Sequence, residues 1–257
     1  MRGDTDPAGV AHDTPARTRR IERVRFELRR REVRVERVQR LSPGFIGVTF
    51  ADESLHDFTS LSFDDHVKFM FQDARGEWVR RDYTPLRHDA VRGELTIEFA
   101  LHAQGPASDW ARQAAVGQTA AIGGPRGSMS VPADYDWHLL AGDASALPAI
   151  ERRLAELASG ARAIVLVEVA DAADCRHLDT AADAQVQWVH GREHWLRALH
   201  DLRLPAGEGF AWCAGEARTM REARELLTGH HGQPRERLKV AAYWKQGAAD
   251  FHERLED

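Results

Sequence analysis

The stretch that decides the fold is residues 138–169, HLLAGDASALPAIERRLAELASGARAIVLVEV. His138–Ala141 is a short apolar strand, and the turn at Gly142 leads into a helix over Ala144–Ser159 with Leu and Ile on one face. Ala163–Val169 is a continuous apolar run of the kind found in parallel strands that are buried on both faces. The stretch therefore predicts a strand–helix–strand unit with a parallel sheet.

The same alternation continues toward the C-terminus. Further strands are predicted at Val186–Val189, Phe210–Cys213 and Leu238–Tyr243, with helices at Trp195–Leu202 and Thr219–Leu227. Strands and helices that alternate at this spacing are typical of parallel βα units, so we expect an α/β domain over residues 133–257.

Residues 22–132 show a different pattern, in which short strands are separated by turn signals. The predicted strands are Val33–Val38, Phe45–Phe50, His66–Gln72, Trp78–Arg80, Glu94–Leu101 and Thr119–Ile122. Such a series predicts a small antiparallel β-barrel. Residues 1–21 lack periodicity and are rich in Asp, Pro, Ala, Thr and Arg, so we expect a disordered N-terminal arm there.

Composition excludes several classes of protein. The chain has 257 residues, a formal net charge of -5 and a pI of about 6.2, which argues against a nucleic-acid binder. Cys175 and Cys213 lack metal-type spacing, so we expect free thiols in a reducing, cytoplasmic compartment and no resident metal. The N-terminus lacks the apolar core of a signal peptide. The chain contains no run of about 18 apolar residues, so we expect no membrane-spanning helix.

Two strand-to-helix turns, at residues 141–145 and 213–217, have the form that offers backbone N–H groups to a phosphate. Neither contains the GxGxxG pattern of a dinucleotide site. Each turn taken singly fits equally well a glycine that only permits a tight turn.

A second candidate group is Arg81, Asp82, Tyr83 and Thr84. Arg81 and Tyr83 face the same side of a strand, so the guanidinium can bind a pyrophosphate while the phenol packs on a flavin ring. The Thr84 hydroxyl can bond the flavin edge. The alternative is an ordinary barrel strand with an exposed arginine and a half-buried tyrosine, and spacing alone favours that alternative.

A third group surrounds a helix predicted at Asp109–Ala115, with Ser108 as its N-cap. The start of this helix is another potential anion site. His102, at the end of the preceding strand, either contacts a ligand or is satisfied by its neighbours. The loop at residues 123–128, which carries Arg126, can bring backbone close to a ligand.

Taken in order, these segments resemble the siderophore-interacting protein family, also called the FAD-dependent ferric-siderophore reductases. The matching pieces are HVKFMF, RDYTPLR, ELTIEFALH, GPASDWA, GGPRGS, GDASALPAI, EVADAAD, AGEA and YWKQG. The similarity runs from about Val33 to the C-terminus. It implies a ferredoxin-reductase-like architecture, with an antiparallel FAD-binding barrel followed by a parallel-sheet NAD(P)H-binding domain.

The resemblance also implies contacts with the cofactors at matching positions. These are Arg81, Tyr83 and Thr84 of the flavin motif with Asp82 between them; His102, Gly105, Pro106, Ala107 and Ser108 of the pyrophosphate-side segment; and Asp143, Ser145 and Ala146, which match an Asp-Glu-Thr-Ala stretch facing the cofactor. Trp244 lies in an aromatic pair that either covers a flavin face or plugs the core. Lys245 and Arg126 are candidates for binding the anionic substrate, and Lys245, Arg176 and Arg192 for the NADPH phosphate.

The chain departs from the family pattern at two places. The family often has an arginine two residues after the threonine, where this chain has Leu86, and Arg87 comes one residue later. A one-residue shift reverses the face of a strand, so Arg87 contacts the flavin only if the chain bends at Pro85. Ala144 and Ser145 replace a Glu-Thr pair, which keeps a hydroxyl and loses a carboxylate.

The implied function is an FAD-dependent ferric-siderophore reductase, which passes electrons from NADPH or NADH through FAD to chelated Fe(III) and releases Fe(II). Electron transfer needs no general acid or base, so we expect no catalytic side chains. Two alternatives remain: a general NAD(P)H:flavin reductase, and a siderophore-binding or ferredoxin-fed electron-transfer flavoprotein without NAD(P)H activity. The expected partners are a ferric siderophore and, in the second alternative, a ferredoxin.

Overall fold

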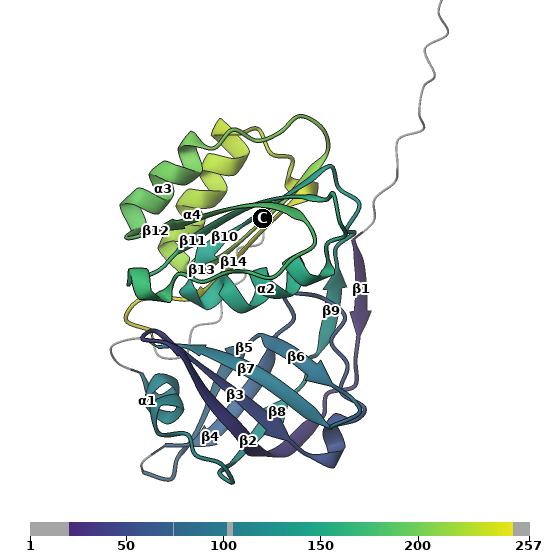
Figure 1. Ribbon diagram of the computed structural model, residues 1–257, viewed down its shortest axis with the longest axis vertical. Coiled ribbons are helices and arrows are strands. Elements are labelled where there is room, and N and C mark those ends of the chain that lie inside the picture. Colours follow the sequence, from purple (N-terminus) through teal and green to yellow (C-terminus); the bar gives the residue numbers. More distant parts are fainter. Residues whose placement is uncertain (1–20, 74, 102–104, 249–257) are drawn as a thin grey trace, which may run out of the picture.

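The first half of the structure is an antiparallel barrel. The computed structural model describes residues 21–248 except 74 and 102–104, and seven of its strands form one sheet in the order β5-β4-β8-β2-β3-β7-β6 (Figure 1). These strands are β2 (Arg30–Ser42), β3 (Phe45–Ala51), β4 (Val67–Gln72), β5 (Trp78–Tyr83), β6 (Pro85–Asp89), β7 (Glu94–Ala100) and β8 (Thr119–Gly123). The long β2 pairs with β8 through its first part and with β3 through its second, which bends the sheet into a barrel.

The barrel is filled by alternate side chains of its strands, as period-two patterning predicts. On β4, Val67, Phe69 and Phe71 are fully buried, whereas the residues between them are more exposed. Helix α1 (Pro106–Gln113) packs against β3, β5 and β7, and its Trp110 belongs to the same buried cluster. Tyr83, at the end of β5, packs against the same cluster, which fixes the position of that end of the strand.

The second half is a parallel sheet with helices on both faces. Its order is β12-β11-β10-β13-β14, formed by β10 (Trp137–Asp143), β11 (Arg162–Glu168), β12 (Asp183–Val189), β13 (Gly209–Glu216) and β14 (Leu238–Trp244). All four pairings are parallel. Helix α2 (Leu147–Glu156) covers the face toward the barrel, and α3 (Arg192–Asp201) and α4 (Ala217–Glu225) cover the other (Figure 1). The predicted barrel followed by a parallel-sheet α/β unit is confirmed.

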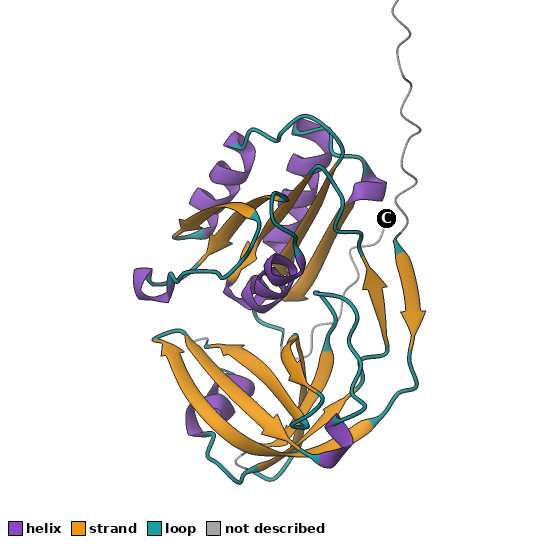
Figure 2. Ribbon diagram, turned by 45° about the vertical axis from the view of Figure 1, so that its right-hand side comes forward, coloured by secondary structure: helices purple, strands orange, loops and turns teal. Residues whose placement is uncertain are grey.

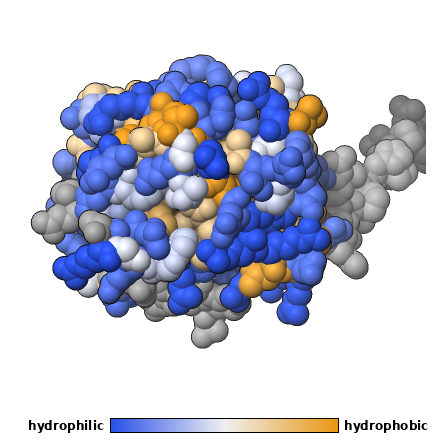
Figure 3. Space-filling view, turned by 90° about the horizontal axis from the view of Figure 1, so that it is seen from below, coloured by the Kyte–Doolittle hydropathy of each residue, from blue (hydrophilic) through white to orange (hydrophobic). Residues whose placement is uncertain are grey.

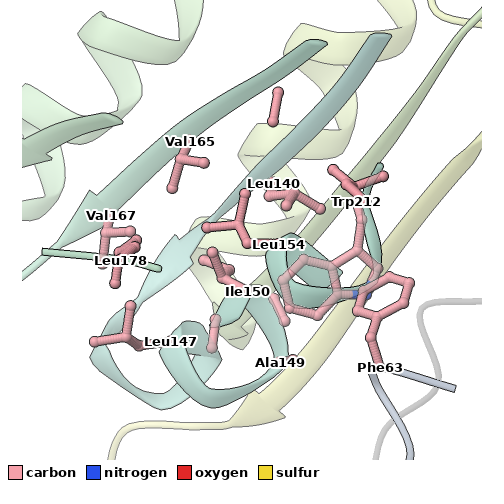
Figure 4. Close-up of a cluster of buried hydrophobic side chains, with 14 of the residues drawn as sticks. Phe63, Leu140, Leu147, Ala149, Ile150, Leu154, Val165, Val167, Leu178 and Trp212 are labelled. Carbon is pink, nitrogen blue, oxygen red and sulfur yellow. The ribbon is translucent and has the colours of Figure 1, made fainter. Parts of the chain in front are cut away.

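The apolar face of α2 packs on the sheet as the sequence predicts. Ile150 and Leu154 are fully buried and lie against Leu140 of β10 and Val165 of β11 (Figure 4). Burying such side chains stabilises a fold by about 1.5–3 kcal/mol each. This cluster holds α2 between the sheet and the barrel.

The two halves share contacts along their whole junction. Strand β1 (Glu22–Arg25) pairs antiparallel with β9 (Gly127–Ser130), and this two-stranded ribbon runs beside both sheets (Figure 2). Phe45 and Phe63 of the barrel half belong to the hydrophobic cluster of the α/β half. The ring of Phe63 lies 5.5 Å from that of Trp212 on β13, edge to face (Figure 4).

Several local predictions differ from the structure. Strands β1, β6 and β9 were not predicted, and the helix predicted over Ala144–Ser159 is a 3-10 turn (Ala144–Ala146) followed by the shorter α2. Further short helical turns are Glu53–Leu55, Ala172–Asp174, Arg235–Arg237 and, as a π-turn after α4, Leu226–His230. Residues 1–20 of the predicted arm lie outside the described residues.

The barrel side of the surface is mostly hydrophilic, with a few separate hydrophobic patches (Figure 3). The large apolar side chains that are most exposed come from different segments: Leu28, Leu61, Trp78, Val91 and Val116. Scattered apolar side chains of this kind are normal on protein surfaces. Within residues 21–248, no helix has the length and apolar character needed to cross a lipid bilayer.

Candidate active site

The end of β5 presents Arg81 and Tyr83 on one face. Arg81 pairs with Phe69 and Tyr83 with Val67 on β4, so both side chains lie on the side of these buried residues. The Tyr83 ring lies 4.5 Å from that of Phe99. Burial raises the pKa of Tyr83 well above its usual range, and the nearby Arg81 charge opposes this. The predicted juxtaposition of guanidinium and phenol is present.

Asp82 points to the opposite face of β5. Lys68 of β4 forms an ion pair with it at 2.8 Å. Beyond Thr84, the pairing of β6 with β7 shifts register between Pro85 and Arg87, so the chain is irregular where the sequence suggested a bend. Arg87 is exposed, and its charge acts on Glu98 of β7.

Thr84 joins the barrel to the last strand of the parallel sheet. Its side chain is 6% exposed, and its hydroxyl lies beside the phenol of Tyr243 near the end of β14, where it opposes the burial that raises the pKa of that phenol. The two residues are separated by more than half of the chain. The flavin motif and the YWKQG stretch are thereby brought into direct contact.

The segment predicted to bind pyrophosphate lies at the start of α1. The helix begins at Pro106 with Gly105 as N-cap, so the prediction of Ser108 as N-cap is wrong, and Ser108 lies buried inside the first turn. Proline fits the first helical position because its φ is already helical. Gly105 has φ 152°, and a Cβ there would meet no atom of the described residues within 4 Å. His102 lies outside the described residues.

Helix α1 is tied to the same core as Tyr83. The ring of Trp110 lies 4.7 Å from that of Phe69 and 5.7 Å from that of Phe99. Tyr83 packs on the same two phenylalanine rings. One aromatic cluster therefore fixes both the arginine–tyrosine pair and the helix that carries Ala107 and Ser108.

Asp143 is the centre of the carboxyl edge of the parallel sheet. Its Oδ1 accepts bonds from the backbone N (2.9 Å) and Oγ (2.5 Å) of Ser145. Asp143 thereby caps the 3-10 turn that contains Ala146. Its Oδ2 accepts bonds from the backbone N of Glu216 (2.9 Å) and from Nε1 of Trp244 (2.8 Å). The ends of β10, β13 and β14 are thus joined by one carboxylate.

The backbone at this edge is closely packed. A Cβ at Gly142 would lie 2.2 Å from the carbonyl oxygen of Ala214 and 2.5 Å from the Cβ of Ala146. Glu216 caps α4 by accepting bonds from the backbone N of Arg218 and Thr219. Both strand-to-helix turns noted in the sequence therefore meet at one place.

Other charged side chains near this edge are paired within the protein. Arg192 donates from Nε to Thr219 (3.0 Å) and pairs with Glu222. Burial, together with the neighbouring Asp143 charge, raises the pKa of Glu168 at the end of β11, and Arg192 opposes this. The side chains of Lys245 and Arg126 are exposed.

A network at the junction of the two halves had no signal in the sequence. Arg176 donates from one nitrogen to Glu98 of the barrel (2.6 Å) and from Nε to Glu151 of α2 (2.8 Å). It is therefore held at the junction of the two sheets. Arg152 of α2 donates to the carbonyl oxygen of Pro85 at 3.0 Å, directly after the flavin motif.

The side chains and backbone donors of this rim fit FAD. A half-buried guanidinium, a half-buried phenol ring, a buried hydroxyl and the start of a helix are gathered on one rim of the barrel. Guanidinium forks and helix N-termini bind pyrophosphate, and aromatic faces bind flavin rings. The capped turn at Asp143 lies at the carboxyl edge of the parallel sheet, which is the edge where ligands bind in α/β sheets.

Comparison with known proteins gives a consistent result. A family model described as siderophore-interacting protein matches residues 135–247, and one described as siderophore-interacting FAD-binding domain matches residues 34–80 and 73–129. The chain is 36% identical over 245 residues to the NADPH-dependent ferric-chelate reductase of Escherichia coli K12, covering 87% of this chain and 96% of that protein. It is 28% identical to the ferric vibriobactin reductase ViuB of Vibrio cholerae, covering 83% and 89%.

Solved structures agree. The crystal structure of a siderophore utilization protein from T. fusca superimposes with a TM-score of 0.84 and 32% identity, covering 91% of this chain and 98% of that one. Both sheets are therefore shared with a solved relative. The chain belongs to the siderophore-interacting protein family, and its barrel half is a siderophore-interacting FAD-binding domain.

Proposed function

We propose that this protein is an FAD-dependent ferric-siderophore reductase, with NADPH as electron donor and chelated Fe(III) as acceptor. The observation that carries the proposal is the contact between Thr84 of the flavin motif and Tyr243, next to the Trp244–Asp143 bond. It supports the proposal because it brings Thr84 of the barrel beside the end of β14, at the carboxyl edge of the parallel sheet. The E. coli and V. cholerae relatives, which are named as ferric-chelate and ferric vibriobactin reductases, support this reaction.

On this proposal the barrel half holds FAD. Arg81 and the N–H groups of Ala107 and Ser108 bind the pyrophosphate, with the Gly105–Pro106 turn beside them. Tyr83 packs on the ring system and Thr84 bonds its edge, while Asp82 braces the strand through Lys68. FAD, when bound, accepts two electrons together as hydride and gives them out singly.

The α/β half receives the nicotinamide nucleotide. Asp143, through its bonds to Ser145 and Glu216, holds the turn containing Ala146 at the carboxyl edge of the sheet, where the nucleotide would bind. Trp244 is held there by its bond to Asp143 and shields the reacting site from water. NADH and a reduced ferredoxin are the alternative donors, and each is to be compared with NADPH in the same assay.

Iron is the substrate and enters as its chelate. Hard oxygen donors bind Fe(III) far more tightly than Fe(II), so reduction releases the metal without any acid or base from the protein. Within the described residues, no group of three His, Cys, Asp or Glu side chains is placed to hold a metal ion. Exposed Lys245 and Arg126 would attract an anionic chelate.

We assign residues 22–132 to the FAD-binding domain and residues 133–257 to the NAD(P)H-binding domain. The two family models, which meet between residues 129 and 135, support this boundary. We place the reaction in the cytoplasm, where NADPH is generated. The free thiols of Cys175 and Cys213 suit that reducing compartment.

The test is an anaerobic visible spectrum of the purified protein reconstituted with FAD. Adding NADPH should bleach the flavin band, and adding a ferric siderophore should restore it while an Fe(II)-specific chelator changes colour. Equal rates with free riboflavin as acceptor would favour a general flavin reductase. Bleaching by reduced ferredoxin but not by NADPH or NADH would favour the electron-transfer alternative and overturn the proposed donor.

A further inference from the structure

Arg152 connects helix α2 of the parallel-sheet half to two segments of the barrel half. Its Nη1 donates to the carbonyl oxygen of Pro85 at 3.0 Å and to Oγ of Ser60 at 2.9 Å, and its Nη2 donates to the carbonyl oxygen of Ser60 at 3.4 Å. Helix α2 lies on the face of its sheet that is turned toward the barrel (Figure 1). One guanidinium therefore holds both barrel segments against the same point of the helix.

The Ser60 side of this contact is fixed by a buried carboxylate. Ser60 donates from Oγ to Oδ2 of Asp65 at 2.8 Å, and Asp65 is 4% exposed. The same oxygen of Asp65 accepts from Oγ of Ser128 on β9 at 2.5 Å. Burial lowers the pKa of Arg152, and the charge of Asp65 opposes this. The guanidinium is therefore bonded to a group that the barrel half itself holds in place.

The Pro85 side of the contact leads directly to the flavin motif. Pro85 follows Thr84, and it lies where the pairing of β6 with β7 shifts register. The proline ring fixes φ, so only one free backbone dihedral separates the Pro85 carbonyl group from the planar Thr84–Pro85 peptide. A bond that holds the carbonyl oxygen of Pro85 therefore also restricts the position of Thr84.

The backbone of Arg152 is continuous with the turn proposed to bind the nucleotide. Helix α2 follows the 3-10 turn that Asp143 caps, and Arg152 lies in the second turn of the helix. Ile150 and Leu154, on either side of Arg152 in the sequence, are fully buried against the parallel sheet. A shift of α2 relative to the barrel would therefore move the Asp143 turn relative to Thr84.

We propose that Arg152 is a positioning residue for hydride transfer: it sets the separation between the Asp143 turn and the flavin motif at Thr84. This inference rests on the proposed function, in which a hydride carries two electrons from NADPH to FAD, so that NADPH is oxidised and FAD is reduced. The rate of such a step depends steeply on geometry, and a displacement of about 1 Å can cost about a hundredfold. Arg152 acts through Pro85 and through α2, without contacting the reacting atoms.

Arg153, the next residue of α2, offers a matched control. It is 3% exposed, and its Nη2 donates to the carbonyl oxygen of Pro132 at 2.6 Å, while its Nη1 pairs with Glu156 at 3.1 Å. Both arginines thus bond a proline carbonyl outside α2, but Pro132 lies between β9 and β10 and not beside the flavin motif. Loss of Arg153 should therefore lower stability without displacing Thr84.

The test compares Arg152→Met, Arg152→Lys and Arg153→Met, each reconstituted with FAD. In stopped-flow absorbance, the rate constant of flavin reduction at saturating NADPH should fall about ten- to hundredfold in Arg152→Met. The dissociation constants of FAD and NADPH should change less than about threefold, because neither ligand loses a direct contact. Arg152→Lys, which keeps the charge but not the guanidinium fork, should recover part of the rate. Arg153→Met should keep the wild-type rate constant, although its thermal midpoint is lower.

A second measurement needs no ligand. In hydrogen–deuterium exchange of the apoprotein, Arg152→Met should speed exchange over residues 79–88, and Arg153→Met should speed it over residues 131–135 instead. An unchanged reduction rate or unchanged exchange over residues 79–88 in Arg152→Met would overturn the inference. An equal loss of rate in Arg153→Met, or a loss of FAD affinity as large as the loss of rate, would also overturn it.

Failure of the inference and failure of the proposed function are distinguishable. If NADPH did not reduce the flavin of the wild-type protein, the proposed function would fail and the inference with it. A normal wild-type reaction together with an unaffected Arg152→Met protein would refute the inference alone.

Discussion

Glu98 gives the sharpest test of the energetics at the junction of the two halves. It lies on β7, is 3% exposed, and accepts a bond from Arg176 at 2.6 Å. Burial raises its pKa from 4.5 to about 7; Arg176 and Arg87 oppose this, and Glu151 adds to it. The substitution Glu98→Gln removes the charge and keeps an oxygen that can accept from Arg176.

The sign and size of the effect follow from this pKa. A carboxyl with a raised pKa binds its proton more tightly in the folded protein, so the contribution of Glu98 to stability is most favourable below pH 4.5 and is lost as the pH rises through about 7. The difference between the two pKa values, at about 1.36 kcal/mol per pH unit, corresponds to about 3 kcal/mol. Glu98→Gln should therefore be more stable than wild type by up to about 3 kcal/mol at pH 8 and nearly equal to it at pH 4.5.

Urea unfolding of both proteins at pH 4.5, 6 and 8 measures this difference. Glu94→Gln is the control, because Glu94 is on the same strand and pairs with Arg37 and Arg92 nearer the surface. The control should not show the growing gain with pH. A Glu98→Gln protein that is less stable than wild type at pH 8 would refute the reasoning. It would mean that attraction to Arg176 outweighs the cost of burying the charge.

Three further substitutions test the site. Arg81→Ala should weaken FAD binding about ten- to hundredfold in a fluorescence titration, because a charge-assisted bond is lost, whereas Arg80→Ala on the exposed side of β5 should have little effect. Gly142→Ala should destabilise the fold by several kcal/mol in urea unfolding, since its Cβ would overlap a carbonyl oxygen; Gly229→Ala, with open space around it, should not. Asp143→Ala should lower the free energy of unfolding by about 0.5–2 kcal/mol, because the cap of the 3-10 turn is lost. It should also change tryptophan fluorescence, and an unchanged emission spectrum would contradict the bond between Asp143 and the indole of Trp244.

The sequence was sufficient for both sheets and for part of the site. The continuous apolar run at Ala163–Val169 and the regular strand–helix spacing identify a parallel sheet, because few other structures bury such strands. Strand alternation alone places Arg81 and Tyr83 on one face. The short strands β1, β6 and β9 were missed because their residues show no clear period-two pattern, and β6 begins at a proline.

What could not be predicted depends on contacts between distant segments. Thr84 meets Tyr243, and Glu98 meets Arg176, only because the two sheets dock against each other. No local pattern distinguishes Glu98 from an exposed strand carboxylate. The start of α1 was placed too late because a serine cap was preferred to a glycine followed by Pro106, although proline is favoured at the first helical position.

The placement of Phe45 and Phe63 in the hydrophobic cluster of the α/β half has a consequence for how the protein evolves and unfolds. Each half completes the interior of the other, so neither can be exchanged for a homologous module without leaving a hole or a clash at the seam. Changes at Phe63 should covary with changes at Trp212, its neighbour across the seam. For the same reason the chain should melt as a single cooperative unit, with no separate transition for either sheet.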